Sequence, residues 1–297
     1  MKKIKQIVTI FATLALAVTA GLSFAGTKTK AAGSDEFTRT AIEVAADMGY
    51  GWNLGNTMEA TNTWTSNPKV TDFETAWGQP VTTKSMIDGI KKAGFNSIRI
   101  PVSWSNMMSS DGNYTIDASY FKRVDEIISY AFANDMYVII NDHYDGGWWE
   151  HFCGNKRDCM KHYKNMWTQV AGHYKDYSEK LIFESANEEL GDSLKKSLSK
   201  IDVNISDTAL YNLVNEINQT FVDIVRQSGG NNARRYLLIA GFNTDIDKTC
   251  SSLYEMPADT ISNHLMVSVH YYTPWTYVGL YKDEGYGYKA TWGTDSD

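Results

Sequence analysis

From position 50 onward, short apolar runs alternate with longer segments whose apolar residues recur every three or four positions. The short runs have the length of buried strands, and the longer segments have the spacing of an amphipathic helix. In the segment 116–135, for example, Phe121, Val124, Ile128 and Ala131 share one helical face. The pattern predicts strands at 50–56, 97–102, 137–142, 181–187, 236–241 and 266–272, and helices at 82–94, 116–135, 159–176 and 208–229.

Strands that alternate with helices predict parallel βαβ units, and the position of the polar residues selects the arrangement. Polar side chains follow or end five of the six predicted strands. In a (β/α)8 barrel all strand ends open into one mouth, whereas in a doubly wound sheet only those near the switch point do so. The sequence therefore favours an α/β fold of the (β/α)8, or TIM barrel, type. A glycine-rich phosphate loop after the first strand, which a nucleotide-binding fold would use, is not found.

The number of strands is smaller than a closed barrel needs. Six can be counted before the sequence stops at Asp297, and a barrel of this type has eight. We therefore expect an incomplete barrel domain over residues 40–297, truncated at its C-terminal end. Neither a linker nor a repeat indicates a second module.

The first residues have the layout of a secretory signal peptide. Lys2, Lys3 and Lys5 precede an apolar run at 7–20, and small residues surround a plausible cleavage point near Ala25. A membrane span needs ~20 apolar residues, which this run does not reach. We expect residues 1–25 to be removed and the protein to be secreted, with no membrane partner.

Composition adds two constraints. With 43% hydrophobic and 21% charged residues the chain is typical of a globular protein, and its formal charge of −7 makes nucleic acid an unsuitable partner. The chain is rich in aromatic residues, with 9 Trp, 18 Tyr and 11 Phe, which can fill a core or stack on flat apolar ligand surfaces. We expect a monomer.

Three cysteines leave two readings open. Cys153 and Cys159 are close enough in sequence to form a disulfide in an exported protein, with Cys250 left free, or all three can be thiols. His151 and His162 flank the pair, but zinc sites usually have tighter ligand spacing. We therefore expect no metal site.

The clearest chemical signal is Asn187-Glu188 at the end of the fourth predicted strand. A carboxylate beside an amide at a barrel mouth suits general acid/base work on a neutral substrate, since the amide can bind a substrate hydroxyl. Acids are also common at solvated helix N-termini, so the pair alone is a weak signal.

The parity of the strands strengthens this signal. Ile98 and Ile100 share one face of the second strand, which leaves Arg99 on the other face. The same alternation places Asn141 with His143, and Ser268 with His270 and Tyr272. Arg99, His143, His270 and Tyr272 therefore project toward the barrel axis. A buried arginine needs an acceptor, and a pair of carboxylates at the mouth would supply it.

Three motifs resemble one known family: YGWNLGNT at 50–57, SIRIPVSW at 97–104 and VHYYTPW at 269–275. They resemble glycoside hydrolase family five, the cellulase and endoglucanase family of clan A, in its bacterial endoglucanase branch. The similarity extends from about Met48 to the end of the chain. Several motifs in the right order make the resemblance specific for the family, and less so for the substrate.

The resemblance implies roles at individual positions. Glu188 would be the acid/base catalyst, Asn187 the ligand of the sugar hydroxyl at the cleavage subsite, and Arg99 the group that orients the nucleophile. His143, His270 and Tyr272 would complete the hydrogen-bonded network around the carboxylates. The implied sugar contacts are Asn53, Asn56, Trp149 and Trp275. The chemistry implied needs no metal and no organic cofactor.

Three departures from the family pattern stand out. Tyr144 occupies the place of a frequent second histidine, and Glu189 that of the usual proline. The nucleophilic glutamate belongs to a seventh strand, and Glu284, in a Gly- and Tyr-rich stretch, is no substitute. The resemblance thus implies an endo-acting, retaining β-1,4-glucanase (a cellulase) that cleaves plant cell-wall polysaccharide, with its nucleophile beyond the chain end. Alternatives are a lichenase, xyloglucanase or mannanase, or a non-catalytic carbohydrate-binding barrel. We expect this chain alone to be inactive.

Overall fold

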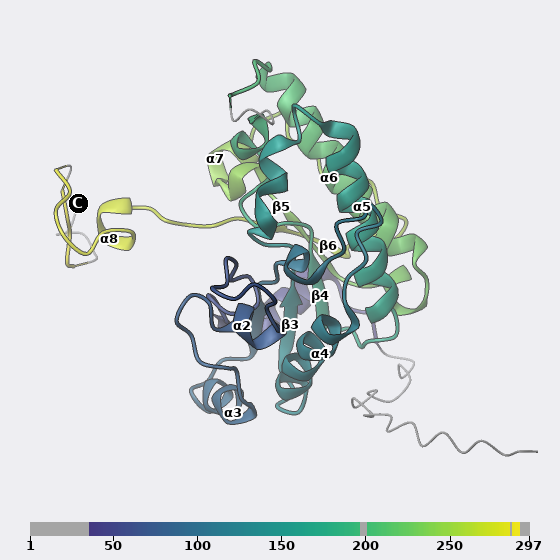
Figure 1. Cartoon of the computed structure of the whole chain (residues 1–297), viewed down its shortest axis with the longest axis vertical. Helices are drawn as coiled ribbons and strands as arrows, with labels where there is room; N and C mark the ends of the chain where they lie inside the picture. Colours follow the sequence, from purple (N-terminus) through teal and green to yellow (C-terminus); the bar gives the residue numbers. More distant parts are fainter. Residues whose placement is uncertain (1–35, 197–200, 286, 292–297) are drawn as a thin grey trace, which may run out of the picture.

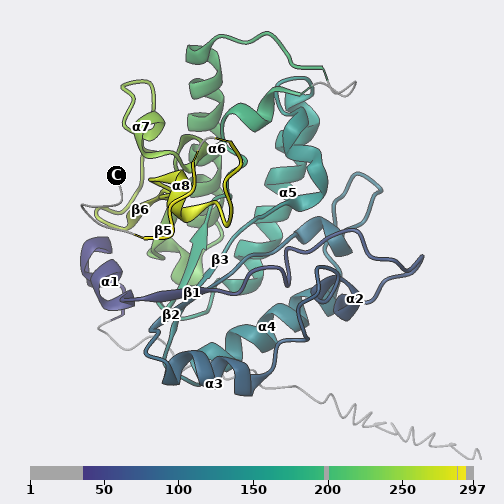
Figure 2. The ribbon, with the colours of Figure 1, turned by 90° about the vertical axis from the view of Figure 1, so that its left-hand side faces the viewer.

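The structure is a computed structural model that describes residues 36–196, 201–285 and 287–291, so the expected signal peptide lies outside the described residues. Its centre is one parallel six-stranded sheet in the order β1-β2-β3-β4-β5-β6. The strands are Gly51–Asn53 (β1), Ser97–Ile100 (β2), Tyr137–Ile140 (β3), Leu181–Glu184 (β4), Leu237–Ala240 (β5) and Leu265–Ser268 (β6). Strands that lie side by side in the order of the sequence, without a reversal, are typical of the wall of a barrel. The sheet curls accordingly, with its helices on the outside (Figures 1 and 2). The α/β fold and the six strands are confirmed.

Eight α-helices are assigned among the described residues. They are Ala41–Met48 (α1), Val70–Glu74 (α2), Lys84–Lys92 (α3), Ala118–Phe132 (α4), Lys156–Tyr174 (α5), Asp207–Gln227 (α6), Ile246–Thr249 (α7) and Trp275–Val278 (α8). Short 3-10 helices span Trp104–Met107 (η1), Asp145–His151 (η2), Asp192–Lys195 (η3), Gly230–Ala233 (η4) and Phe242–Thr244 (η5). The four helices expected from the sequence are present as α3 to α6. Thr83, Asp117 and Ser206 cap three of them by accepting a bond from a backbone N–H of the first turn.

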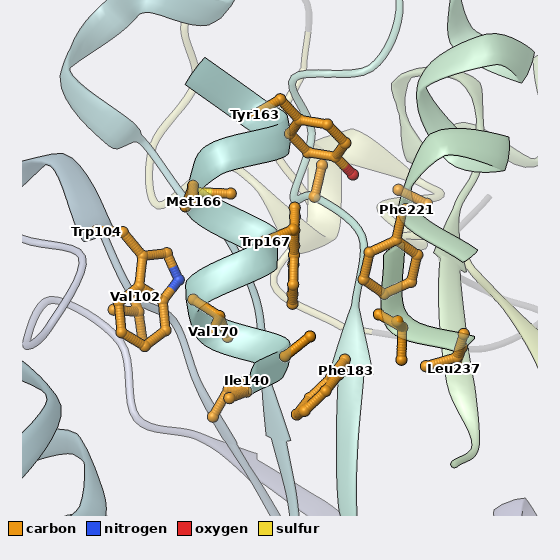
Figure 3. Close-up of a cluster of buried hydrophobic side chains, with 14 of the residues drawn as sticks. Val102, Trp104, Ile140, Tyr163, Met166, Trp167, Val170, Phe183, Phe221 and Leu237 are labelled. Carbon is orange, nitrogen blue, oxygen red and sulfur yellow. The ribbon is translucent and has the colours of Figure 1, made fainter. Parts of the chain in front are cut away.

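The main core lies between the outer face of the sheet and α4, α5 and α6. Figure 3 shows Trp167 of α5 between Phe183 of β4 and Phe221 of α6, with ring centroids 5.8 and 4.6 Å apart. All three side chains are fully buried, which contributes ~1.5–3 kcal/mol for each. This packing fixes the position of β4, whose end carries the expected acid/base residue.

A second, smaller core closes the N-terminal end of the barrel interior. Phe37, Ala41 and Val44, from α1 and the residue stretch before it, pack against the inward-facing Tyr137, Ile182 and Tyr236. The side chains of Thr40 and Glu43 form a capping box that fixes the start of α1. Sequence analysis did not assign this helix. Helix α1 thus covers the N-terminal end of the barrel interior, opposite the strand ends that carry the expected site residues.

The two outer strands, β1 and β6, each pair on one side only among the described residues. Apolar side chains near them are correspondingly open, with Trp52 47%, Val267 41% and Val269 39% exposed. Uncovered edges of this kind offer unpaired backbone groups to a further strand. Within the described ranges, no helix has both the length and the apolar character needed to cross a membrane.

Candidate active site

A layer of polar side chains lies inside the barrel, nearer to the C-terminal strand ends than the apolar layer that contacts α1. Glu184 is at the centre of this polar layer. Glu184 is fully buried at the end of β4. Its Oε2 atom accepts hydrogen bonds from Arg99 Nε (2.7 Å) and Asn141 Nδ2 (3.0 Å), and its Oε1 atom accepts one from Ser268 Oγ (2.7 Å). One carboxylate thus connects β2, β4, β6 and the residue after β3.

Glu184 is the functional residue that sequence reasoning missed. We expected a pair of carboxylates at the mouth to accept hydrogen bonds from the Arg99 guanidinium. Instead, Arg99 Nε donates to the single carboxylate of Glu184, deeper in the barrel. A signal was available, because Glu184 has the same strand parity as the inward-facing Ile182 and is a charged residue ending an apolar run.

Arg99 also orients two amides at the mouth. Its Nη1 atom donates to Asn53 Oδ1 and its Nη2 atom to Asn187 Oδ1, both at 3.0 Å. Because the amide oxygens face Arg99, the amide NH2 groups face away from it and can donate to a ligand. The backbone N–H of Asn187 donates to Asp142 O at 3.1 Å, which fixes the chain on that side of Glu188.

Glu188 is half exposed and contacts His270, whose Nδ1 atom lies 2.5 Å from Glu188 Oε1. The backbone of His270 is held by a bond from its N–H to Thr244 O. The hydrogen bond from His270, helped by the positive charges of His270 and Arg99, lowers the pKa of Glu188 below its ordinary value of 4.5. In this arrangement Glu188 is an ionised carboxylate.

His143 is a neutral imidazole beside this site. Burial lowers its pKa to about 3, and the positive charges of Arg99 and His270 act in the same direction. Its Nδ1 atom lies 3.5 Å from Asn141 Nδ2, and its backbone N–H donates to Val102 O. A neutral ring can accept one hydrogen bond and donate another.

The other expected residues lie apart from this network. Tyr272 and Trp275 are about half exposed and pack against each other, with ring centroids 5.8 Å apart, where the chain leaves β6 toward α8. Figure 1 shows that α8 stands away from the sheet. Asn56 has a left-handed backbone (φ 61°), and its N–H donates to Glu59 Oε1.

The position of Trp149 differs from the expectation that this residue contacts the sugar. Its ring is only 2% exposed, stacks on Trp148 at 4.4 Å and donates through Nε1 to Asp142 Oδ2 at 2.9 Å. A ring enclosed on this scale has no free face for a sugar, so Trp149 serves the core. The sequence could not reveal this because Trp148 and Trp149 are adjacent, and only the turn of η2 decides which one faces inward.

The cysteines are all free thiols, so the disulfide reading for Cys153 and Cys159 does not hold in this structure. Cys159 donates to Trp148 O, and burial raises the pKa of its thiol to about 11. The described part of the chain contains no group of three or more His, Cys, Asp or Glu residues arranged to hold a metal ion.

Glu284 lies on the projecting segment that follows α8, where it pairs with Lys282 at 3.3 Å. An exposed ion pair of this kind is screened by solvent and contributes little to stability.

A curled parallel sheet whose strand ends carry an arginine, two amides, two histidines and an acid defines the class of (β/α)8-barrel glycoside hydrolases. Residues 58–296 match the family model described as Cellulase (glycosyl hydrolase family 5). The chain belongs to this family.

Relatives with bacterial endoglucanase names support the same branch. Endoglucanase A of Paenibacillus barcinonensis is 40% identical over 90% of this chain and 66% of its own length. A broad-specificity endoglucanase of Ruminococcus champanellensis, solved with cellotriose, has a TM-score of 0.76 and 34% identity, covering 88% of this chain and 73% of that one. A lichenase mutant of Caldicellulosiruptor sp. F32, solved with cellotetraose, has a TM-score of 0.76 and 36% identity, covering 90% and 72%.

The chain is shorter than these proteins. It spans 66%, 54% and 48% of the length of the first three curated relatives that it matches.

Proposed function

We propose that this chain is the substrate-binding and acid/base part of an endo-acting β-1,4-glucanase that retains anomeric configuration. The observation that carries the proposal is the contact of Glu188 with His270 beside Asn187, which is itself held by Arg99. Membership of family 5 and the cello-oligosaccharides bound by two similar structures support a β-glucan as the substrate.

In the proposed mechanism Glu188 donates a proton to the leaving oxygen and later takes one from water. The NH2 group of Asn187 faces away from Arg99 and donates to a sugar hydroxyl, so that the bond to be cleaved lies against Glu188. The neutral imidazole of His143 supplies a further hydrogen bond without adding charge.

A second carboxylate is needed for double displacement. Glu184 cannot serve, because both of its oxygens already accept bonds from Arg99, Asn141 and Ser268 inside the barrel. A second acid close to Glu188 would also raise the pKa of Glu188, which is lowered here, and so supply the protonated form that donates. We propose that the whole enzyme, meaning this chain together with the strand that bears this carboxylate, holds the complete site.

The first test of this proposal is stereochemical. A retaining enzyme holds its two carboxyl groups ~5–5.5 Å apart, which leaves no room for a water between them. The whole enzyme should therefore release the β-anomer first from barley β-glucan or cellohexaose, followed by slow mutarotation. Proton NMR of the anomeric signals in the first minutes measures this, and an initial α-anomer would contradict the double-displacement mechanism.

The range of glucans is proposed to be broad. The similar structures include an endoglucanase named as broad in specificity and a lichenase, so cellulose and mixed-linkage glucan are both candidate substrates. We propose further that the enzyme is exported, on the basis of residues 1–25, that it acts as a monomer and that it needs no cofactor. Activity that survives a chelator would agree with the last point.

The isolated chain should hydrolyse β-glucan at less than a thousandth of the rate of the whole enzyme. Glu188 is ionised in the described arrangement and so has no proton to donate. In addition, none of the described residues is proposed as the nucleophile that double displacement needs. Reducing-sugar release by residues 26–297, measured beside the whole enzyme at equal concentration, checks this. Turnover within tenfold of the whole enzyme would show that a carboxylate of this chain acts as nucleophile, and Glu284→Gln would identify or exclude Glu284.

A further inference from the structure

The dipeptide Asn243-Thr244, which follows β5, is bonded to both segments that carry the acid/base residue and its histidine partner. The backbone N–H of Asn243 donates to Leu190 O at 2.5 Å, two residues after Glu188. The carbonyl of Thr244 accepts from the backbone N–H of His270 at 2.7 Å. The proposed mechanism gives this dipeptide no role, yet it touches the backbone on both sides of the Glu188–His270 contact.

The side chain of Asn243 adds two bonds to the segment that runs from β4 into η3. Its Oδ1 atom accepts from the backbone N–H of Asp192, and its Nδ2 atom donates to Asp192 Oδ2, both at 2.8 Å. One acceptor and one donor of the amide are thus used on a single residue, which fixes its orientation. Together with the bond to Leu190, three hydrogen bonds join the loop after β5 to the segment that bears Glu188.

Gly191 provides the space for this amide. Its backbone has a φ of 149°, and a Cβ atom at this position would lie 1.9 Å from Asn243 Oδ1 and 2.8 Å from Asn243 Cγ. A residue with a side chain therefore fits here only if the amide leaves its place. Gly191 and Asn243 are matched to each other across the two segments.

Asp192, the partner of the amide, is anchored from its other side. Lys195 Nζ donates to its Oδ1 atom at 2.6 Å, and Lys248 Nζ donates to its Oδ2 atom at 2.8 Å. Hydrogen bonds from these two lysines lower the pKa of Asp192 far below its ordinary value, so it offers Asn243 a charged acceptor. Because Asp192 is about half exposed, each ion pair adds little stability, and the effect of the pairs is to orient the carboxylate.

The backbone of the dipeptide is strained. Asn243 and Thr244 both have left-handed conformations, with φ of 53° and 50°. Asparagine adopts this conformation readily, whereas β-branched threonine rarely does. Thr244 is buried, and its Oγ1 atom donates to Asn243 O at 2.6 Å. Such a conformation persists only where its surroundings hold it, and here it directs the Thr244 carbonyl to the N–H of His270.

We propose that Asn243 is a positioning residue that keeps Glu188 and His270 in contact. Its own bonds hold the segment of Glu188, and the carbonyl of the next residue holds His270. The consequence for turnover rests on the proposed function, whereas the contact between the two side chains does not.

A looser contact changes the charge state of Glu188. His270, after β6, and Arg99, of β2, are the charged groups that act on Glu188 among the described residues, and His143, after β3, is neutral. The hydrogen bond from His270 is the largest of these effects, and it lowers the pKa of Glu188. Loss of this bond should therefore raise the pKa of Glu188.

The decisive variant is Asn243→Gly in the whole enzyme, because glycine adopts the left-handed backbone and lacks only the amide. The kcat on β-glucan should fall about tenfold, and that on an aryl cellobioside with an activated leaving group less than about threefold, since this substrate needs little protonation. A purely structural effect lowers both rates by the same factor, because it reduces only the amount of folded enzyme. Equal losses on the two substrates would overturn the positioning role.

Asn263→Gly is the matched control. Asn263 also has a left-handed backbone (φ 61°), and it precedes β6, at the opposite end of this strand from His270. Both rates should stay within about twofold of the unmodified enzyme, since glycine adopts this backbone without strain. A selective loss on β-glucan in this control as well would assign the effect to glycine in a left-handed turn and overturn the role of the amide.

An exchange of side chains tests the pair directly. Asn243→Asp places a second carboxylate against Asp192 and should lower kcat on β-glucan further than Asn243→Gly. Adding Asp192→Asn to Asn243→Asp again leaves one donor and one acceptor between the two side chains, and it should recover kcat by about threefold or more. The absence of any recovery would overturn the proposed pair.

A titration without turnover separates this proposal from the proposed function. Carboxyl 13C NMR of the whole enzyme, labelled at glutamate, follows the ionisation of Glu188, and Glu188→Gln identifies its signal. The pKa of Glu188 should be higher by about half a unit or more in Asn243→Gly and unchanged in Asn263→Gly. An unchanged pKa in Asn243→Gly would overturn the positioning role. This titration decides that role even where the enzyme shows no glucanase activity, so the two failures are distinguishable.

Discussion

Replacing Glu188 by glutamine in the whole enzyme should reduce hydrolysis of β-glucan by about 10²–10⁴-fold, because a poor leaving group departs only with a proton from a general acid. Glutamine keeps an oxygen for His270 and a similar volume, so folding should be preserved. Substrates with an activated aryl leaving group need little protonation and should lose much less in the first step. Initial rates on β-glucan and on an aryl cellobioside measure the two effects.

The second half of the reaction gives a sharper check on Glu188. The aryl substrate should accumulate a glycosyl-enzyme, because water then lacks its general base, and a small anion such as azide should restore turnover since it needs no base. Glu284→Gln is the matched control at an exposed glutamate and should behave as the unmodified enzyme. Equal losses on both substrate types, with no effect of azide, would remove Glu188 from the acid/base role.

Replacing Glu184 by glutamine should cost about 3–5 kcal/mol of unfolding free energy at neutral pH, because it leaves the Arg99 guanidinium without its buried countercharge. The same change should lower kcat, since Arg99 holds Asn187 at 3.0 Å and would turn toward the new amide or toward solvent. Urea unfolding and steady-state kinetics on the whole enzyme measure the two effects.

An exposed pair is the appropriate control for Glu184. Glu216→Gln breaks the Lys156–Glu216 pair, in which both side chains are about half exposed, and should change the unfolding free energy by less than ~1 kcal/mol. If Glu184→Gln is as mild as this control, Arg99 does not depend on Glu184, and the polar layer is not held together as described.

Much of the fold follows from the sequence, because strands and helices are encoded locally. The six apolar runs form β1 to β6, and the periodic segments form α3 to α6, since burying one face of each segment is the dominant stabilising effect. Alternation along a strand is just as local, so the inward direction of Arg99 follows from its apolar neighbours Ile98 and Ile100. By the same reasoning, the inward direction of Glu184 could have been predicted from the sequence.

Other features depend on contacts between distant segments, which no local pattern encodes. The burial of Trp149 in place of its neighbour Trp148 results from the turn of η2 against α5. Thr40 and Glu43 give helix α1 a local start signal, but its place at the N-terminal end of the barrel depends on contacts with distant strands. The missing Cys153–Cys159 bond likewise reflects the placement of the two thiols by α5 and the turn before it.

The barrel wall, the family and the residues at the strand ends can be predicted from the sequence, because each depends on a short motif or on the period of a single element. The way in which these residues work together depends on the fold, which makes Glu184 the acceptor of Arg99 and Glu189 the acceptor of the Tyr144 backbone N–H. Charge and hydrogen bonding act over a few ångströms in space, and they join residues far apart in the chain, such as Arg99 and Glu184, which are 85 positions apart.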